Sequence, residues 1–410
     1  MQGCGKDKVK RTYTYTFYKP VYKTTAEVRA NIKSNAPKQV ENPGKIYLKD
    51  QYIFLNEIDK GIHIINNADP SHPQNIAFID IPGNMDIAVK DNILYADLYT
   101  DLVAIDISNP QQVALKKVIE DIFPNRYWGG GFYADSTKVV ASWEKRDTTI
   151  VQEMQLGSWG NRDSQAFFMA TDASRGAGGF ALSANVSKSP YGVGGSMARF
   201  TIAEDRLYTV GYSNLDVFNI TNAVNPMHTG RKNLGWNIET IYPFMDKLFI
   251  GSQTGMFIYS ISSNPDNPDP AGQFNHIRSC DPVIADNKYA YVTLRSGTTC
   301  QGFTNQLDIV QLNHLFNASL VKVYNLTNPH GLSKDGNLLF ICDGQAGLKI
   351  YEASDVLNLK LIKQINNLET YDVIALGGIA LVVAKDGLYQ YDYSSVSDIR
   401  FLSKITVSKP

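Results

Sequence analysis

Short apolar runs separated by polar turns recur along the chain about every 42 residues, between residues 45 and 407. The clearest copies are MDIAVKDNILYADLYTDLVAIDISNP (85–110), PHGLSKDGNLLFICDGQAGLKIYEASD (329–355) and YDVIALGGIALVVAKDGLYQYDYSSV (371–396). Each copy has three runs of strand length with turns of Asp, Asn or Gly between them, and a fourth run follows a polar or Pro-rich link. Four short strands in each repeat of this length are typical of a β-propeller, so the pattern predicts an all-β fold.

The number of blades follows from one position in each repeat, a Tyr, Phe or Val at the centre of the second run. Eight such positions can be counted: Phe54, Tyr95, Val140, Tyr208, Phe249, Tyr291, Phe340 and Val382. We therefore predict a propeller of eight four-stranded blades. A longer gap follows Val140, which indicates an insertion in the third repeat. The alternative is seven blades, with residues 125–196 forming an elaborated insertion.

The repeats predict one propeller domain over residues 27–410, with the insertion at about 148–196 and a tether at 1–26. Residues 27–32 could add a strand to the last blade and help to close the ring. The glycines within 157–196 are expected to form a flexible loop.

Composition excludes several classes of function. Basic and acidic residues number 39 and 40, and no run of Lys or Arg suggests a phosphate-binding stripe, so we do not expect a nucleic-acid partner. No run of about 18 apolar residues predicts a membrane-spanning helix. The phosphate-binding, serine-hydrolase, zinc-protease and dinucleotide motifs are also missing from the sequence. We expect a monomer.

The first residues carry a candidate lipidation site. Cys4 follows a Gly and precedes the polar stretch Gly5-Lys6-Asp7-Lys8, as in bacterial lipoproteins whose mature chain begins at a lipid-modified Cys. The apolar segment that usually precedes such a Cys does not stand before Cys4 in this sequence. The alternative is an unmodified Cys in a frayed terminus.

Four stretches carry a resemblance to a known family: residues 44–73, 81–110, 280–300 and 329–351, with LVAIDISNP and GLKIYEASD at the third strands. They resemble the LVIVD-repeat family of bacterial propellers, and within it the Bacteroidetes surface lipoprotein branch. The resemblance implies a propeller fold, a lipid anchor at Cys4 and a place on the outer membrane, exposed at the cell surface. It supplies no catalytic residues. The third repeat departs from the family because it lacks the Asn-Pro link.

Residues at the start of the first strands should meet around the mouth of the central channel. Those positions are Lys45, Asp86, Gly130 or Gly131, Arg199, Glu239, Asp281, His330 and Asp372. Carboxylates with an imidazole suit a divalent cation such as Ca²⁺, so Asp86, Glu239, Asp281, His330 and Asp372 are candidate ligands for a metal or a small molecule. The competing interpretation is that these polar groups satisfy loop N–H groups in a wide, water-filled channel.

The cysteines and aromatic residues complete the candidates. Cys280 and Cys300 flank a predicted hairpin and are candidates for a disulfide, whereas Cys342 is expected to be a buried, inert thiol. Tyr127, Trp128, Trp143, Trp159 and Trp236 could stack on a sugar or a peptide if they face the mouth, or simply pack between blades.

Two functions follow from these observations. The favoured hypothesis is a non-enzymatic binding platform for a protein, a glycan or a small ligand, held at the membrane by its lipid alone. The alternative is a metal-dependent hydrolase or lyase, in which the ring residues hold the ion and one carboxylate acts as the base.

Overall fold

The computed structural model describes residues 8–123, 127–128, 132–133, 137–155, 190–276, 282–297, 304–312 and 318–408. The chain forms two compact units. One consists of Met1–Arg29 with Arg126–Ala173, and the other of Ala30–Asn125 with Ser174–Pro410.

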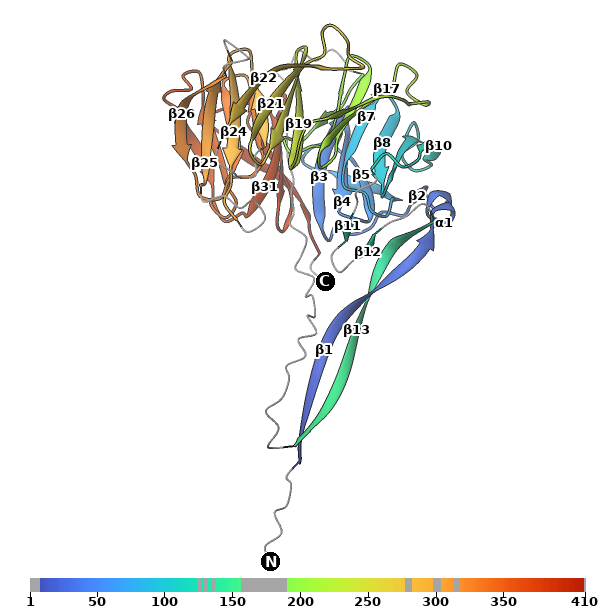
Figure 1. Ribbon diagram of the computed structural model, residues 1–410. Helices are drawn as coiled ribbons and strands as arrows, with labels where there is room; N and C mark the ends of the chain where they lie inside the picture. The colour runs from blue at the N-terminus through green and yellow to red at the C-terminus, as the bar shows by residue number, and fades with distance from the viewer. Residues whose placement is uncertain are drawn as a thin grey trace, which may run out of the picture. The chain divides into compact units, whose positions relative to one another are not determined.

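The larger unit is a propeller of seven four-stranded blades, numbered here in chain order (Figure 1). Blades 1 to 3 consist of β3 Pro43–Lys49, β4 Tyr52–Glu57, β5 Gly61–Asn66 and β6 Gln74–Asp80; β7 Ile87–Lys90, β8 Ile93–Leu98, β9 Asp101–Asp106 and β10 Ala114–Ile119; and β15 Phe200–Ala203, β16 Arg206–Val210, β17 Asn214–Asn219 and β18 Met227–Asn233. Blades 4 and 5 consist of β19 Ile238–Phe244, β20 Lys247–Ser252, β21 Gly255–Ser260 and β22 Asp269–Asn275; and β23 Val283–Ala285, β24 Tyr289–Leu294, β25 Gln306–Gln311 and β26 Ser319–Asn325. Blades 6 and 7 consist of β27 Leu332–Asp335, β28 Leu338–Cys342, β29 Leu348–Glu352 and β30 Lys360–Ile365; and β31 Thr370–Leu376, β32 Ile379–Ala384, β33 Gly387–Asp392 and β34 Arg400–Thr406.

Each blade is an antiparallel meander whose apolar second strand is buried between its neighbours. All six residues of β8 are buried, for example, and β4 is buried except at Tyr52. Tight turns join the strands: Asp91 has a φ of 50° between β7 and β8, and Gly377 and Gly378 have φ values of 58° and 88° between β31 and β32. These left-handed positions suit Gly and Asp, which explains the turn residues of the repeat.

The prediction of eight blades is wrong, and the alternative of seven is confirmed. Seven of the eight counted positions lie in second strands, but Val140 lies in β13 (Lys138–Gln155), which pairs with β1 (Lys8–Thr24) and not with a blade. Val140 and Val139 are buried, so they have the apolar signature of a blade strand. The third and fourth strands expected for that repeat, at 167–172 and about 180–186, lie outside the described residues.

The smaller unit contains a long two-stranded ribbon. β1 and β13 pair antiparallel from Lys8↔Gln155 to Thr24↔Lys138, with a bulge between Val21 and Tyr22. Thus residues 8–24, assigned above to a tether, form a strand, and the departure from the repeat begins before residue 148. A second pair in this unit, β11 (Tyr127–Trp128) with β12 (Phe132–Tyr133), is short.

Residues 27–32 do not form the expected closing strand. Thr25–Ala30 is the helix α1, which begins with a capping box: the Thr24 hydroxyl accepts a hydrogen bond from the Glu27 N–H at 3.2 Å, and the Glu27 carboxylate accepts one from the Thr24 N–H at 2.8 Å. The chain then adds β2 (Ser34–Asn35) to β6 of blade 1.

Blade 1 and blade 7 come from opposite ends of the chain and do not share a strand. They meet through packing and side-chain hydrogen bonds. Ile46 and Ile53 of blade 1 pack with Ile374 and Leu381 of blade 7 in one buried cluster. A parallel bridge between Val40 and Val407 lies beside this seam.

A segment of the chain enters the channel, which the competing interpretation of the polar ring took to be wide and water-filled. Residues 190–198 include β14 (Val193–Gly194), which pairs with β3 of blade 1. The Gly192 N–H donates to the Val89 carbonyl of blade 2 at 3.0 Å, and the Ser196 hydroxyl accepts from the Leu332 N–H of blade 6 at 3.1 Å. A segment of nine residues that touches the first strands of three blades and then enters β15 of blade 3 lies inside the ring. We call residues 190–198 the plug.

The plug corrects the expectation of a flexible loop for its glycines. Gly194 and Gly195 are buried, and the Tyr47 hydroxyl donates to the Gly192 carbonyl at 3.1 Å. Glycine is required here because an added Cβ at Gly192 would lie 2.3 Å from the Tyr47 ring and 2.7 Å from the Leu48 carbonyl oxygen.

Within the described residues, no helix has the length and apolar character needed to cross a membrane.

Candidate functional site

The first strands of successive blades lie side by side around the channel and begin on one face, which we call the mouth. Asp86, Glu239, His330 and Asp372 all lie at the starts of such strands, on blades 2, 4, 6 and 7. The structure thus places these four at equivalent positions on four blades, and their meeting in one ligand site stays a prediction. Asp281 lies outside the described residues.

Asp86 is the centre of a buried network. Its carboxylate pairs with the Lys45 ammonium of blade 1 and accepts hydrogen bonds from the Arg199 N–H at 2.6 Å and the Ile87 N–H at 2.8 Å. Lys45 and Asp86 are 5% and 2% exposed. Burial lowers the pKa of Lys45, and the Asp86 carboxylate opposes that shift. The Asp86 carboxylate is therefore already bound by groups of the protein itself.

Asn84 and Asp97 extend this network away from Asp86. Asp97 Oδ1 accepts hydrogen bonds from Asn84 Nδ2 at 2.8 Å, from the Met85 N–H at 2.8 Å and from the Asp86 N–H at 2.9 Å. Asn56 Nδ2 of blade 1 donates to Asn84 Oδ1 at 2.6 Å. The loop between blades 1 and 2 is therefore held by side chains that the repeat pattern did not single out.

Glu239 is only half-buried, unlike Asp86. Its carboxylate accepts a hydrogen bond from Gln253 Nε2 at 2.9 Å, and its backbone carbonyl lies 3.4 Å from Arg199 Nε. At the boundary of blades 3 and 4, the Glu239 side chain thus binds an amide while its backbone is approached by a guanidinium, and all three side chains are half-buried.

His330 is buried beside a cation. The Arg295 guanidinium lies 3.0 Å from Nδ1 and 3.2 Å from Nε2 of His330, and the Tyr371 ring packs edge-on at 5.3 Å between centroids. Burial and the Arg295 charge lower the pKa of His330 to about 3, so the imidazole is neutral and accepts a hydrogen bond. Arg295 is half-buried, and burial lowers its pKa. Arg295 is not among the candidates predicted from the sequence. Those candidates are starts of first strands, whereas Arg295 follows the second strand of blade 5.

Asp372 is fully buried and differs from the other carboxylates. Its Oδ1 accepts a hydrogen bond from the Val373 N–H at 2.7 Å, while Oδ2 has no hydrogen-bond partner among the described residues. Burial raises the pKa of Asp372 well above its usual value, which Lys45 opposes only in part. Gly331 leaves room for this carboxyl, since an added Cβ would lie 2.5 Å from Oδ1.

These contacts place charges of both signs around the mouth, and Lys45 and Asp86 form a buried ion pair there. Around the ring, Lys45, Arg199 and Arg295 alternate with Asp86 and Glu239. The metal hypothesis considered the carboxylates and His330 as ligands and left these cations out. Among the described residues, no three His, Cys, Asp or Glu side chains gather as they would around a metal ion. A calcium site would need six to eight oxygens at close range, and the described carboxylates are turned toward N–H groups and cations instead.

Of the cysteines, Cys342 is a buried thiol in β28, as expected, and burial raises its pKa well above the usual value. Such a thiol is not reactive. Cys4, Cys280 and Cys300 lie outside the described residues, so the lipidation site and the disulfide remain predictions.

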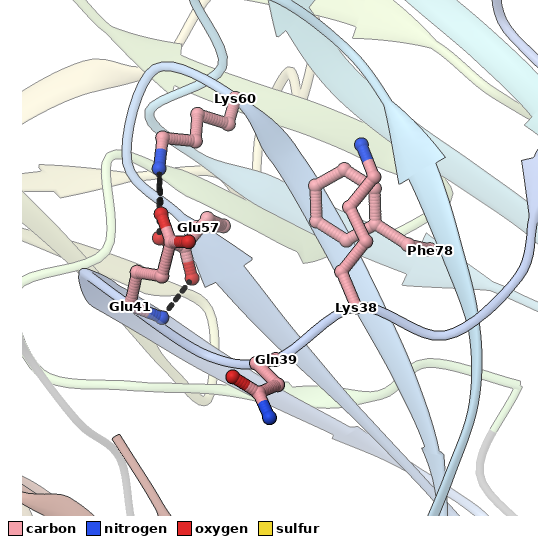
Figure 2. A pocket seen from close by; sticks show the side chains of 6 residues that line it. All are labelled: Lys38, Gln39, Glu41, Glu57, Lys60 and Phe78. Atoms are coloured by element: carbon pink, nitrogen blue, oxygen red, sulfur yellow. Dashed lines mark hydrogen bonds and ion pairs between the residues drawn. The ribbon is translucent and has the colours of Figure 1, made fainter. Parts of the chain in front are cut away.

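A separate pocket of about 470 Å³ lies in blade 1 beside residues 38–41 (Figure 2). Its charged groups are already paired: Lys60 binds Glu41, and Lys38 lies over the Phe78 ring at 4.2 Å. Burial alone would raise the pKa of Glu57, but hydrogen bonds from His63 and from the Glu41 and Asn42 N–H groups outweigh it and leave the pKa lowered. We therefore interpret this pocket as part of the scaffold.

The fold and the mouth define a seven-bladed β-propeller with a plugged channel. No family model matches the chain, and no curated protein matches it. Among solved structures, it is similar to a protein from Lactobacillus plantarum (TM-score 0.55, 11% identity, 90% of this chain and 97% of that one). It is also similar to a putative 6-phosphogluconolactonase from Bacteroides fragilis (0.55, 10%, 91% and 98%) and a periplasmic gluconolactonase from Pseudomonas aeruginosa (0.52, 10%, 90% and 97%). At these identities the similarity shows the fold alone.

Proposed function

We propose that this protein is an exported, lipid-anchored β-propeller that acts as a non-enzymatic binding platform at the bacterial cell surface, and that it belongs to the LVIVD-repeat family. One observation carries the binding role: the Lys45–Asp86 ion pair and the Arg199 N–H bound to Asp86 join three blades beside a plugged channel. Such a mouth is a rigid floor surrounded by loops, which suits recognition better than turnover. The repeat resemblance and Cys4 support the family and the anchor.

The alternative, a metal-dependent hydrolase or lyase, has one observation in its favour. Asp372 combines burial, a raised pKa and an Oδ2 without a described partner, and the ring of Tyr371, its neighbour in the chain, packs against the neutral His330. Groups with shifted pKa values gather at active sites more often than elsewhere. Two of the similar folds are lactonases, but at 10% identity their chemistry does not transfer to this chain.

Elemental analysis of protein purified without chelator separates the two functions. The platform predicts no stoichiometric metal. Stoichiometric metal that is lost in the double variant His330→Ala and Asp281→Ala would overturn the platform and support the enzyme. The matched control is His72→Ala, which removes an exposed imidazole from the loop between β5 and β6.

The anchor has its own test. Intact cells that express the protein are labelled with a membrane-impermeant reagent and then fractionated. The wild-type protein should be labelled and recovered with membranes, and Cys4→Ser should be released from them. A Cys4→Ser protein that stays anchored at the surface would refute the lipid tether.

A further inference from the structure

Two exposed aromatic side chains touch each other on the mouth face. Tyr212 lies in the loop between β16 and β17, and Trp236 lies in the link from β18 to β19. Their rings meet edge-on, with 6.2 Å between centroids and 76° between planes. Tyr212 is 54% exposed and Trp236 is 75% exposed. An indole this exposed is unusual, because Trp is highly buried on average.

The backbone around this pair is firmly held. The Gly235 N–H donates to Asn233 Oδ1 at 2.8 Å, and the Ile238 N–H donates to the Tyr212 carbonyl at 3.0 Å. Asn237 has a φ of 59°, and its carbonyl accepts from the Gln253 N–H at 3.0 Å. The indole is therefore presented on a fixed corner, so a ligand that stacks on it would not have to order the loop first.

Planar polar groups are linked to this corner by hydrogen bonds, since the Gln253 N–H binds the Asn237 carbonyl. Glu239 is three residues beyond Trp236, and it accepts the hydrogen bond from Gln253 on the neighbouring strand end. Arg199 Nε approaches the Glu239 carbonyl. Carboxylate, amide and guanidinium groups can each bind two adjacent hydroxyls, while an aromatic face stacks on the apolar side of a pyranose ring.

We propose that Trp236 and Tyr212, with Glu239, Gln253 and Arg199, form a saccharide-binding site at the boundary of blades 3 and 4. This inference rests on the proposed function, since it names the ligand class of the same mouth. One carboxylate and one guanidinium at the boundary balance each other in charge, which favours neutral sugars over strongly acidic or basic ligands. The exposed indole provides the stacking surface.

The test is titration of the wild-type protein with cellohexaose, maltohexaose and mannohexaose. Binding is measured by isothermal calorimetry and by tryptophan fluorescence. We expect binding of at least one of the three, with a change in the emission of the exposed indole. Trp236→Ala should weaken that binding by about tenfold or more. Gln253→Ala should weaken it by a smaller factor. Phe401→Ala, which removes an aromatic ring that is 56% exposed on β34, is the matched control and should bind as the wild type does.

Two results would overturn the saccharide site: no binding of any of the three oligosaccharides to the wild type, or equal binding by Trp236→Ala. Thermal unfolding of each variant shows whether it is folded. We expect folded variants, because Trp236 and Phe401 are exposed and can be truncated without opening a cavity. Loss of the saccharide site would leave the platform standing if the protein is free of metal. Stoichiometric metal at the mouth would overturn the platform whatever the sugars do.

Discussion

The Asp86 carboxylate contacts groups of three blades. It pairs with the Lys45 ammonium and accepts hydrogen bonds from the Ile87 N–H and the Arg199 N–H. A carboxylate used in this way joins neighbouring sheets at the point where loop N–H groups would otherwise be buried without partners. The strand count alone could place Asp86, Glu239, His330 and Asp372 on one ring. It could not show that the Lys45 ammonium and the Arg199 N–H would bind Asp86, because such contacts depend on the rotation between blades and on side-chain direction.

His330 should make the stability of the protein depend on pH. Its folded pKa of about 3 lies below the usual 6.5, so above pH 6.5 both states are neutral and the full stability is present. As pH falls from 6.5 toward 3, the unfolded chain binds a proton that the folded chain does not, and stability is lost at about 1.4 kcal/mol per pH unit. We expect this part of the slope to disappear in His330→Gln.

Urea unfolding at several pH values between 4 and 7.5 measures that slope. His72→Gln controls for the loss of one imidazole, because its side chain is 80% exposed. Equal slopes for the wild type and His330→Gln would show that the imidazole titrates in the folded protein as it does in the unfolded chain.

Asp372 should have the opposite dependence. Because burial raises its folded pKa, the stability it contributes is present below the unfolded value of 3.8 and is lost as pH rises. Asp372→Asn keeps an oxygen for the Val373 N–H and cannot ionise, so at pH 7 it should be more stable than the wild type, and the difference should shrink toward pH 4. Denaturant unfolding at the two pH values gives the comparison.

The exposed Asp398→Asn, whose side chain is 69% exposed, should stay within about 0.5 kcal/mol of the wild type at both pH values. If Asp372→Asn were instead less stable at pH 7, the carboxylate would be ionised and stabilised in the folded state, and the enzyme alternative would lose the raised pKa on which it rests.

At the scale of elements, the spacing of apolar runs at about 42 residues was sufficient to locate the second strands of all seven blades. It misassigned β13 because an apolar run indicates a strand without showing which strand it pairs with. The partner of Val140 is Tyr22, more than a hundred residues earlier in the chain. The plug was missed for a similar reason, since its glycines resemble those of a loop until a second surface is placed against them.

The plug gives a steric prediction. Gly192→Ala would place a methyl group 2.7 Å from the Leu48 carbonyl oxygen, which belongs to β3 and cannot rotate away. Overpacking of this kind costs about 1–3 kcal/mol, which urea unfolding detects. Gly211→Ala is the matched control, because its nearest neighbouring atom would be 4.0 Å away. A Gly192→Ala protein as stable as Gly211→Ala would mean that the plug does not lie against β3.

At the scale of the whole molecule, the ring is closed without a strand shared between the chain ends. Blade 1 and blade 7 are joined by a reciprocal amide pair: Asn67 Nδ2 donates to Gln390 Oε1 at 3.0 Å, and Gln390 Nε2 donates to Asn67 Oδ1 at 2.7 Å. Gln390 is 1% exposed, so its amide depends on Asn67. The Ser403 hydroxyl adds a hydrogen bond to the Pro70 carbonyl at 2.6 Å along the same seam.

Gln390→Ala should therefore destabilise the protein by about 1–3 kcal/mol, since it removes a buried bond and leaves the Asn67 amide unsatisfied. Asn67→Ala should do the same, and the double variant should lose less than the sum, because the two side chains form one interaction. Denaturant unfolding of the four proteins completes this cycle. Additive losses would mean that the amides act separately. A second transition in Gln390→Ala would mean that the ring opens at this seam before it unfolds, since in a propeller each blade is covered only by its neighbours.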